Sequence, residues 1–159
     1  MALALFLTFF IMSPTFEAAW EQGVRPYVDG EIEEKEAFER SLRPLQNFMQ
    51  KFVRDQDLKL FMDIANIPPV ATPNDIPAKV LIPAFIISEL RRAFEIGFLV
   101  FIPFLVIDMV VASVLMSMGM MMLPPIIIAL PFKIIFFVLV DGWFLIVGSL
   151  VQSFGALGP

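Results

Sequence analysis

The sequence predicts an all-α membrane protein, with long kinked apolar helices and a small polar helical domain. Its composition is the first reason: 58% of the 159 residues are hydrophobic and 17% are charged, against about 45–50% and about 25% in soluble domains. The second is uneven charge, because residues 17–79 hold 12 acids and 8 bases whereas residues 80–159 hold four acids and three bases. The third is a spacing of apolar residues by three and four, the period of a helix.

The first apolar stretch, residues 1–12, is shorter than a membrane span. A spanning helix needs about 20 residues, and a signal peptide would carry an early positive charge, whereas the first one here is Arg25. A residue that precedes proline is disfavoured in a helix, so we expect this helix to end at Ser13 and Pro14. Residues 1–16 are therefore interpreted as the C-terminal remnant of a transmembrane helix.

Residues 17–79 predict a polar helical domain on the water side of a membrane. Pro44 lies inside the helical pattern, so we expect a kink or a helix restart there. Asp57 is expected to cap a second short helix. Four prolines within ten residues make 67–79 a loop and a linker. The apolar residues on one face of the first helix are Phe38, Leu42, Leu45, Met49, Phe52 and Val53.

Residues 80–159 predict two long apolar helices broken at residues 123–125. Residues 96–122 contain a single charge and would form a helix roughly 40 Å long, enough to cross a core about 30 Å thick. Pro103 is expected to kink this helix, and Pro124 and Pro125 to end it. Residues 126–151 then form the second helix. A charged collar precedes the pair, interpreted as a solvated helix face, and consists of Glu89, Arg91, Arg92 and Glu95.

Three charges inside the apolar helices, Asp108, Lys133 and Asp141, need an explanation. Each would cost about 2.5–3.5 kcal/mol at the centre of a membrane helix. Counted from Pro124, Asp108 and Asp141 lie at nearly the same depth and Lys133 does not, so a straight hairpin would not pair Lys133 with Asp108. Bent helices or partners on another subunit remain as solutions, and we favour the second. Asp141 also fits a simple helix end.

A methionine cluster precedes the proline break. Met120, Met121 and Met122 follow Gly119 directly, and glycine and proline both interrupt helices. Flexible thioether side chains adapt to varied apolar surfaces, and an apolar constriction blocks ions by excluding water. These residues therefore predict a soft pore constriction, unless methionine merely replaces leucine at a helix end in lipid.

Several functions are disfavoured by what the sequence lacks. Without Cys or His it has no thiol chemistry, no Cys-ligated metal and no imidazole base. Its net charge of −5 disfavours nucleic-acid binding, which needs clustered cations. No phosphate-binding glycine motif is present. We therefore expect no catalytic residue, no metal and no cofactor.

Several motifs together resemble one known family. They are SEL-RAF-IGF at 88–98, IPFLVID at 102–108, GMMMLPP at 119–125, ALPFK at 129–133 and VDGW at 140–143. ALFLTFFIM at 4–12 and PLQNFM at 44–49 add to them. The sequence resembles the FliP family of the flagellar type III export gate over nearly its whole length. Family members carry a signal and a further hydrophobic helix before ALFLTFF, so we expect an N-terminally truncated chain.

The resemblance implies a protein-conducting channel subunit rather than an enzyme. Five copies would assemble with FliQ and FliR into a helical cone in the bacterial inner membrane, at the flagellar basal body, and contact FlhB and FlhA. Unfolded flagellar subunits would pass through it, and residues 17–79 would be periplasmic. Met120, Met121 and Met122 would form a pore gasket, and Asp108, Lys133 and Glu89 would occupy charged family positions.

An ion- or proton-coupled transporter is the alternative function. Asp108, Lys133 and Asp141 would then relay charge through the apolar helices. The methionine run separates the two hypotheses, because a transporter does not need three consecutive methionines at a broken helix. An intramembrane enzyme is the weakest hypothesis, since no nucleophile–base pair stands out.

Overall fold

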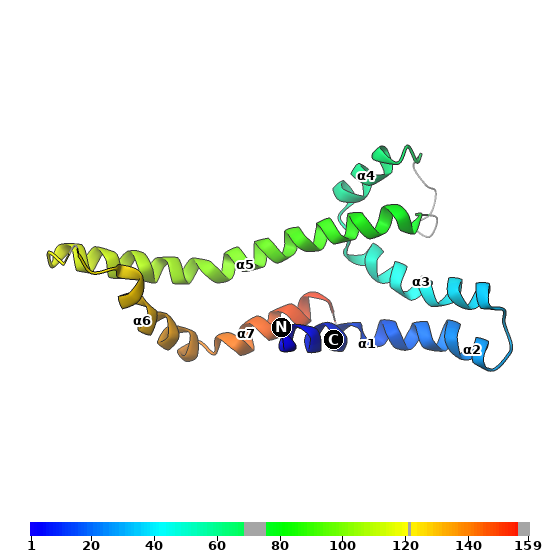
Figure 1. Cartoon of the computed structure of the whole chain (residues 1–159), viewed down its shortest axis with the longest axis horizontal. Coiled ribbons are helices and arrows are strands. Elements are labelled where there is room, and N and C mark those ends of the chain that lie inside the picture. Colours follow the sequence, from blue (N-terminus) through cyan, green and yellow to red (C-terminus); the bar gives the residue numbers. More distant parts are fainter. Residues whose placement is uncertain (69–75, 121, 156–159) are drawn as a thin grey trace. The chain divides into compact units, whose positions relative to one another are not determined.

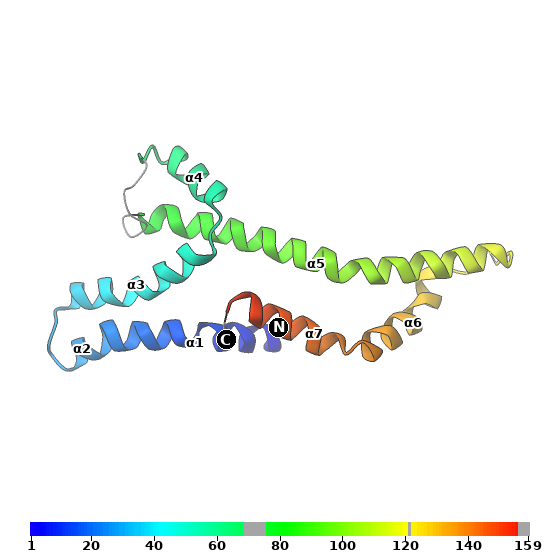
Figure 2. The same cartoon turned by 180° about the vertical axis from the view of Figure 1, so that it is seen from behind.

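The computed structural model describes residues 1–68, 76–120 and 122–155. These residues form helices and turns without a strand, which confirms the predicted all-α class. The chain divides into a first unit, Met1–Ala93, and a second unit, Phe94–Pro159. Figures 1 and 2 show the helices of each unit from opposite sides. In chain order the elements are α1 (Ala2–Ala19), a π-helical turn η1 (Trp20–Val24), α2 (Arg25–Val28), α3 (Glu34–Phe52), α4 (Asp55–Ile64), α5 (Ala78–Ser117), α6 (Pro125–Leu139) and α7 (Gly142–Ser153).

Helix α1 does not end where the sequence predicted. It runs through Pro14 to Ala19, and with η1 and α2 it makes an apolar helical segment of 27 residues, Ala2–Val28, long enough to cross a membrane. The expected stop at Ser13 is therefore wrong. Proline disfavours a helix without forbidding it. In an apolar solvent, ending the helix would leave several backbone groups without hydrogen-bond partners, and this costs more than keeping the proline inside the helix.

The π-helical turn brings α1 and α3 close together. Gly23 is buried in this turn, and α1 lies beside α3 in both views (Figures 1 and 2). A Cβ atom on Gly23 would lie 2.6 Å from the Ala37 carbonyl oxygen and 2.7 Å from the Ser41 nitrogen. The absence of a side chain at this position thus allows the two backbones to approach.

The polar middle of the chain forms two helices, α3 and α4. Pro44 lies inside α3, which continues without a restart. Helix α4 begins at Asp55 with Arg54 as its N-cap residue, so the expectation that Asp57 is the cap is wrong. Asp57 occupies the first turn instead. Of the expected loop at 67–79, residues 69–75 lie outside the described residues.

The start of α5 forms the core of the first unit. Val80, Leu81 and Ala84 are at most 2% exposed, and they recur at the spacing of one helix face. Phe85 contacts Phe48 of α3, with ring centroids 6.0 Å apart. This face seats the beginning of α5 against the polar middle of the chain.

Helix α5 is longer than the predicted apolar run. It covers 40 residues, Ala78–Ser117, twice the roughly 20 that a membrane span needs. Pro103 lies within it and does not interrupt it. The charged collar belongs to this same helix, so the polar start and the apolar run are one element.

The second apolar run is two helices and not one. Helix α6 ends at Leu139 and α7 starts at Gly142, with a bend of 59° between them. A Cβ on Gly142 would lie 2.3 Å from the Phe137 ring, and the Phe137 ring meets Trp143 edge to face at 5.3 Å. The break therefore depends on a glycine that leaves room for an aromatic ring, which helical periodicity does not reveal.

Candidate functional site

The candidate site lies where α5 turns back into α6, in the second unit. Helix α5 ends in a Schellman motif: the Gly119 N–H bonds to the Met116 carbonyl at 3.1 Å, and the Met120 N–H to the Leu115 carbonyl at 3.0 Å. Gly119 has a φ of 73°, a conformation that glycine adopts without strain. The helix therefore ends at Ser117, three residues before the first of the three consecutive methionines.

Two prolines then start the next helix. Pro124 is the N-cap residue of α6 and Pro125 is its first residue, where a missing N–H costs nothing because that donor has no helical partner. Gly119, Pro124 and Pro125 thus lie at the helix break that the sequence placed there. Pro103, by contrast, lies within continuous helix.

The methionines at this turn expose their side chains. Met120 is 42% exposed and Met122 is 98% exposed. Met121 lies outside the described residues. Met116 and Met118, at the end of α5, are 58% and 61% exposed. The turn therefore carries thioether side chains that the chain itself does not bury.

Asp108 and Lys133 form an ion pair between α5 and α6. The Lys133 ammonium donates to Asp108 Oδ2 at 2.7 Å, and the two side chains are 25% and 20% exposed. A carboxylate and an ammonium among apolar helices stabilise each other because neither has water to replace its partner. The second carboxylate oxygen, Oδ1, is buried and has no hydrogen-bond partner in the described parts of the chain.

The prediction that a hairpin would not pair these charges is wrong. The prediction measured the depth of each charge from Pro124 and assumed that the first helix continues to residue 122. Helix α5 instead ends at Ser117, nine residues after Asp108, and α6 starts at Pro125, eight residues before Lys133. Both charges therefore lie roughly 12–14 Å from their helix ends. The contact between subunits predicted for them stays a prediction.

Asp141 and Glu89 lie away from this ion pair along the chain. Asp141 stands between α6 and α7 with a φ of 52°, a left-handed conformation that Asp tolerates better than most residues. This position agrees with the helix-end interpretation. Glu89, on α5 in the first unit, forms an ion pair with Arg92 one turn later, at 3.1 Å.

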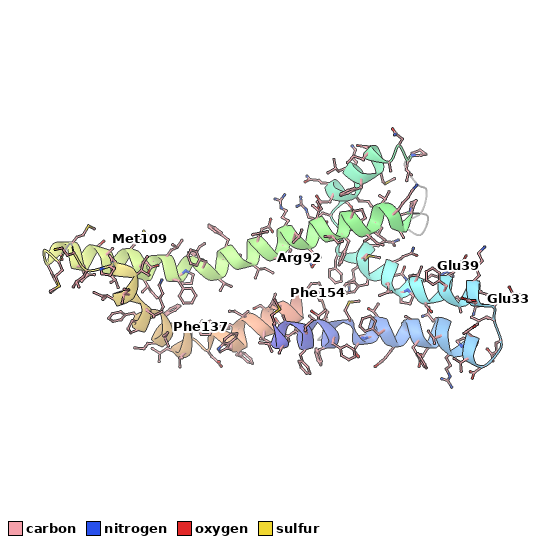
Figure 3. All side chains as sticks on the ribbon, in the orientation of Figure 1. Glu33, Glu39, Arg92, Met109, Phe137 and Phe154 are labelled. Carbon is pink, nitrogen blue, oxygen red and sulfur yellow. The ribbon has the colours of Figure 1, made fainter. Side chains whose placement is uncertain are left out.

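An apolar groove of about 480 Å³ lies between α5 and α6. Val110, Val114 and Ile128 are among its lining residues, all of which are apolar. Phe104 also contacts Phe136 and Phe137 across these helices, with centroids 6.3 and 6.2 Å apart. Figure 3 shows Phe137 on α6 and Met109 on α5. The groove can hold apolar groups, and none of its lining residues carries a polar side chain.

Sequence reasoning missed Ser88 on α5. It is 2% exposed, and its hydroxyl bonds to the Arg54 N–H at 3.0 Å and to Asp57 at 2.7 Å. The SEL motif contains it, but only the neighbouring charges drew attention there. A serine in an otherwise apolar helix face is the signal that could have identified it.

Possible metal ligands do not cluster in the described ranges 1–68, 76–120 and 122–155. These ranges contain no group of three or more acidic, His or Cys side chains that could hold an ion. The arrangement around the turn is thus a helix stop, exposed thioethers and one ion pair. Such an arrangement can line or close a passage.

Comparison with known proteins shows the family. The FliP family model matches residues 1–150. The flagellar biosynthetic protein FliP of Caulobacter vibrioides is 60% identical over 153 residues, 96% of this chain and 58% of that relative. The FliP of Bacillus subtilis is 59% identical over 152 residues, 96% of this chain and 69% of the relative.

A third relative, the FliP of Agrobacterium fabrum, is 56% identical over 156 residues, 97% of this chain and 64% of the relative. The chain thus spans 58–69% of the length of these three relatives. The resemblance drawn from the sequence motifs is confirmed. The chain belongs to the FliP family.

Proposed function

We propose that this chain is a subunit of the flagellar type III export gate and helps to form its protein-conducting channel. The observation that carries the proposal is the turn between α5 and α6, where a glycine and two prolines bracket exposed methionines. Membership of the FliP family supports the flagellar export role. Among the described residues, the segments Ala2–Val28 and Ala78–Ser117 are each long and apolar enough to span a membrane, which supports a membrane location.

The proposed mechanism is a deformable seal. Several copies would bring Met120, Met121 and Met122 around one passage, and their thioethers would exclude water when no cargo is present. Unbranched side chains with three rotatable bonds can move aside for varied polypeptide side chains. Binding of any one sequence is not needed, so one seal serves many unfolded substrates.

The proposed surroundings follow from the family. Five copies assemble with FliQ and FliR in the bacterial inner membrane, and FlhB and FlhA contact the assembly at the flagellar basal body. The polar residues that follow the segment Ala2–Val28, residues 29–79, face the periplasm, in keeping with their charge: 10 acids and 7 bases among 51 residues. The energy for transport comes from partners, and this subunit performs no catalysis.

The test replaces Met120, Met121 and Met122 with alanine in the complete export gate. Alanine keeps the positions apolar but removes the volume that fills the passage, so small ions should leak while the complex assembles. Ion conductance measures the leak, and native mass spectrometry measures the assembly. Met109→Ala is the matched control, because Met109 is also exposed, at 63%, but lies on α5 away from the turn.

Two results would contradict the seal. One is a triple variant that assembles and stays ion-tight. The other is an equal leak from Met109→Ala, since that would indicate a general loosening of the complex.

An ion-coupled transporter is the second candidate function. The Asp108–Lys133 ion pair favours it, because ionisable groups within apolar membrane helices commonly mark ion or proton pathways. Transport that loses its dependence on the proton gradient in Asp108→Asn, with the methionine variants unaffected, would support this candidate over the channel.

A further inference from the structure

The buried hydroxyl of Ser88 lies between two groups of another helix. Its oxygen accepts the Arg54 N–H at 3.0 Å and lies 2.7 Å from Asp57 Oδ2, to which it donates. The Ala84 carbonyl, at 2.9 Å, is a second acceptor for the same hydrogen. We propose that Ser88 is a positioning residue that couples the first turn of α4 to the seating of α5.

The coupling arises from an incomplete capping box. Arg54 is the N-cap residue of α4, and α4 has no side-chain cap bond of its own. Asp57 lies three residues later, where a Glu or Gln normally reaches back to the N-cap N–H. Asp is shorter by one methylene group. Ser88 Oγ fills the gap, so the N–H of Arg54 and the carboxylate of Asp57 are joined through a hydroxyl from α5.

Two contacts on the same stripe of α5 fix the position of this hydroxyl. Phe85, three residues before Ser88, packs on Phe48 of α3 at 6.0 Å. Arg92, four residues after it, lies 5.5 Å from the centre of the Phe52 ring, beside the end of α3 (Figure 3). Residues three and four apart share a helix face, so all three contacts require one rotational setting of α5.

The consequence is reciprocal. When α5 is seated, the first turn of α4 is capped; when α5 rotates or lifts, the partly buried Arg54 N–H and the Asp57 carboxylate lose their shared partner. An unsatisfied buried polar group is unfavourable. Thermodynamic coupling acts equally in both directions. Loss of order at the start of α4 must therefore weaken the packing of α5 by the same free energy that the packing of α5 contributes to the start of α4. This coupling does not depend on the proposed channel function, since all its residues lie in the first unit.

The first test measures amide hydrogen exchange in this chain in detergent micelles. Ser88→Ala should make the Arg54 amide and the first-turn amides of α4 exchange about fivefold faster, the factor expected for a lost cap. Ser113→Ala is the matched control: Ser113 is also on α5, but its hydroxyl bonds to the Met109 carbonyl of its own helix. Equal exchange in both variants would overturn the proposal.

A second variant tests the role of the carboxylate. Asp57→Ala should accelerate hydrogen exchange at the same amides as Ser88→Ala does. Exchange in the double variant should be no faster than in either single variant, because both substitutions remove the same hydrogen-bond network. Asp57→Asn keeps an acceptor oxygen in place and should change exchange by less than twofold. Additive effects would contradict the shared hydroxyl.

A third measurement separates capping from coupling. The chain has no cysteine, so spin labels can be attached at Lys59→Cys on α4 and Leu90→Cys on α5, and their distance distribution measured. Ser88→Ala should broaden it. Adding Asp57→Glu, which can reach the Arg54 N–H directly, should restore slow exchange but not the narrow distribution. An unchanged distribution in Ser88→Ala would show that Ser88 does not position α5.

Discussion

The two units of the chain are stabilised in different ways. Where α3, α4 and the start of α5 meet in the first unit, apolar residues are buried and polar groups bond between helices, as Ser88 does with Arg54 and Asp57. In the second unit many apolar side chains are exposed, among them Leu139 at 79% and Met122 at 98%, and the Asp108–Lys133 ion pair joins α5 to α6. The first has its own core, whereas the second needs lipid or other chains to cover its surface.

The difference predicts how each unit responds to substitution. A unit with its own core is sensitive to steric changes between its helices, because packed interiors do not absorb extra atoms. A unit that exposes apolar surface has room for such changes, but a charge left without its partner there has no water to replace it. The following substitutions test this contrast.

Breaking the ion pair should have the largest effect. Asp108→Asn or Lys133→Ala leaves the remaining group among apolar helices, where an isolated charge costs about 2.5–3.5 kcal/mol. We expect either single change to block assembly or export, measured by recovery of the complex and by secretion of flagellar subunits. Unaltered export in both variants would exclude a role for the pair.

A charge swap sharpens this test. Asp108→Lys combined with Lys133→Asp keeps the pair and reverses its direction, so it should restore part of the lost function if the two side chains contact each other. Failure of the swap, with the double neutral variant at least as defective as either single change, would indicate that each charge has a separate partner.

A methyl group at Gly23 should have the next largest effect, within the first unit. Gly23→Ala places a Cβ 2.6 Å from the Ala37 carbonyl oxygen, and overpacking typically costs about 1–3 kcal/mol. Gly97→Ala is the control, because apart from the backbone of its own helix nothing lies within 4 Å of the added Cβ, and alanine favours a helix by about 1 kcal/mol. The midpoint of thermal unfolding in detergent should thus fall in Gly23→Ala and rise in Gly97→Ala. Equal shifts of the midpoint in the two variants would contradict the close approach of η1 and α3.

Gly142→Ala should have the smallest effect of the three. Its Cβ would meet the ring of Phe137 rather than backbone, and a ring can turn aside. The edge-to-face contact with Trp143 should weaken, which the tryptophan fluorescence spectrum can report in a Trp20→Phe background. A destabilisation as large as that of Gly23→Ala would mean that the second unit is packed as tightly as the first.

The sequence predicted the features that depend on composition and on local signals. The all-α class follows from apolar periodicity, and the break before α6 from the two prolines, although the preceding helix was expected to reach residue 122 and ends at Ser117. The rule that a proline ends a helix failed at Pro14. The steric preference of the residue before proline for an extended conformation competes with the need of backbone N–H and C=O groups for hydrogen-bond partners in an apolar environment. The same competition explains the continuous helix at Pro103.

The features that the sequence did not reveal depend on contacts between elements. Whether Asp108 can reach Lys133 depends on where α5 ends. An end at residue 117 rather than 122 moves Asp108 about 7.5 Å closer to the end of its helix. The break at Asp141 and Gly142 depends on the Phe137 ring, and the role of Ser88 depends on an amide in another helix. Each is a matter of geometry that residue spacing does not encode.

The exposed thioethers at the turn after α5 have a chemical consequence. Oxidation of methionine to its sulfoxide turns an apolar, flexible side chain into a polar and chiral one. Met122, at 98% exposed, is open to peroxide wherever the assembly does not cover it. A seal made of such side chains would take up water once oxidised, and methionine sulfoxide reductases would be the enzymes able to restore it.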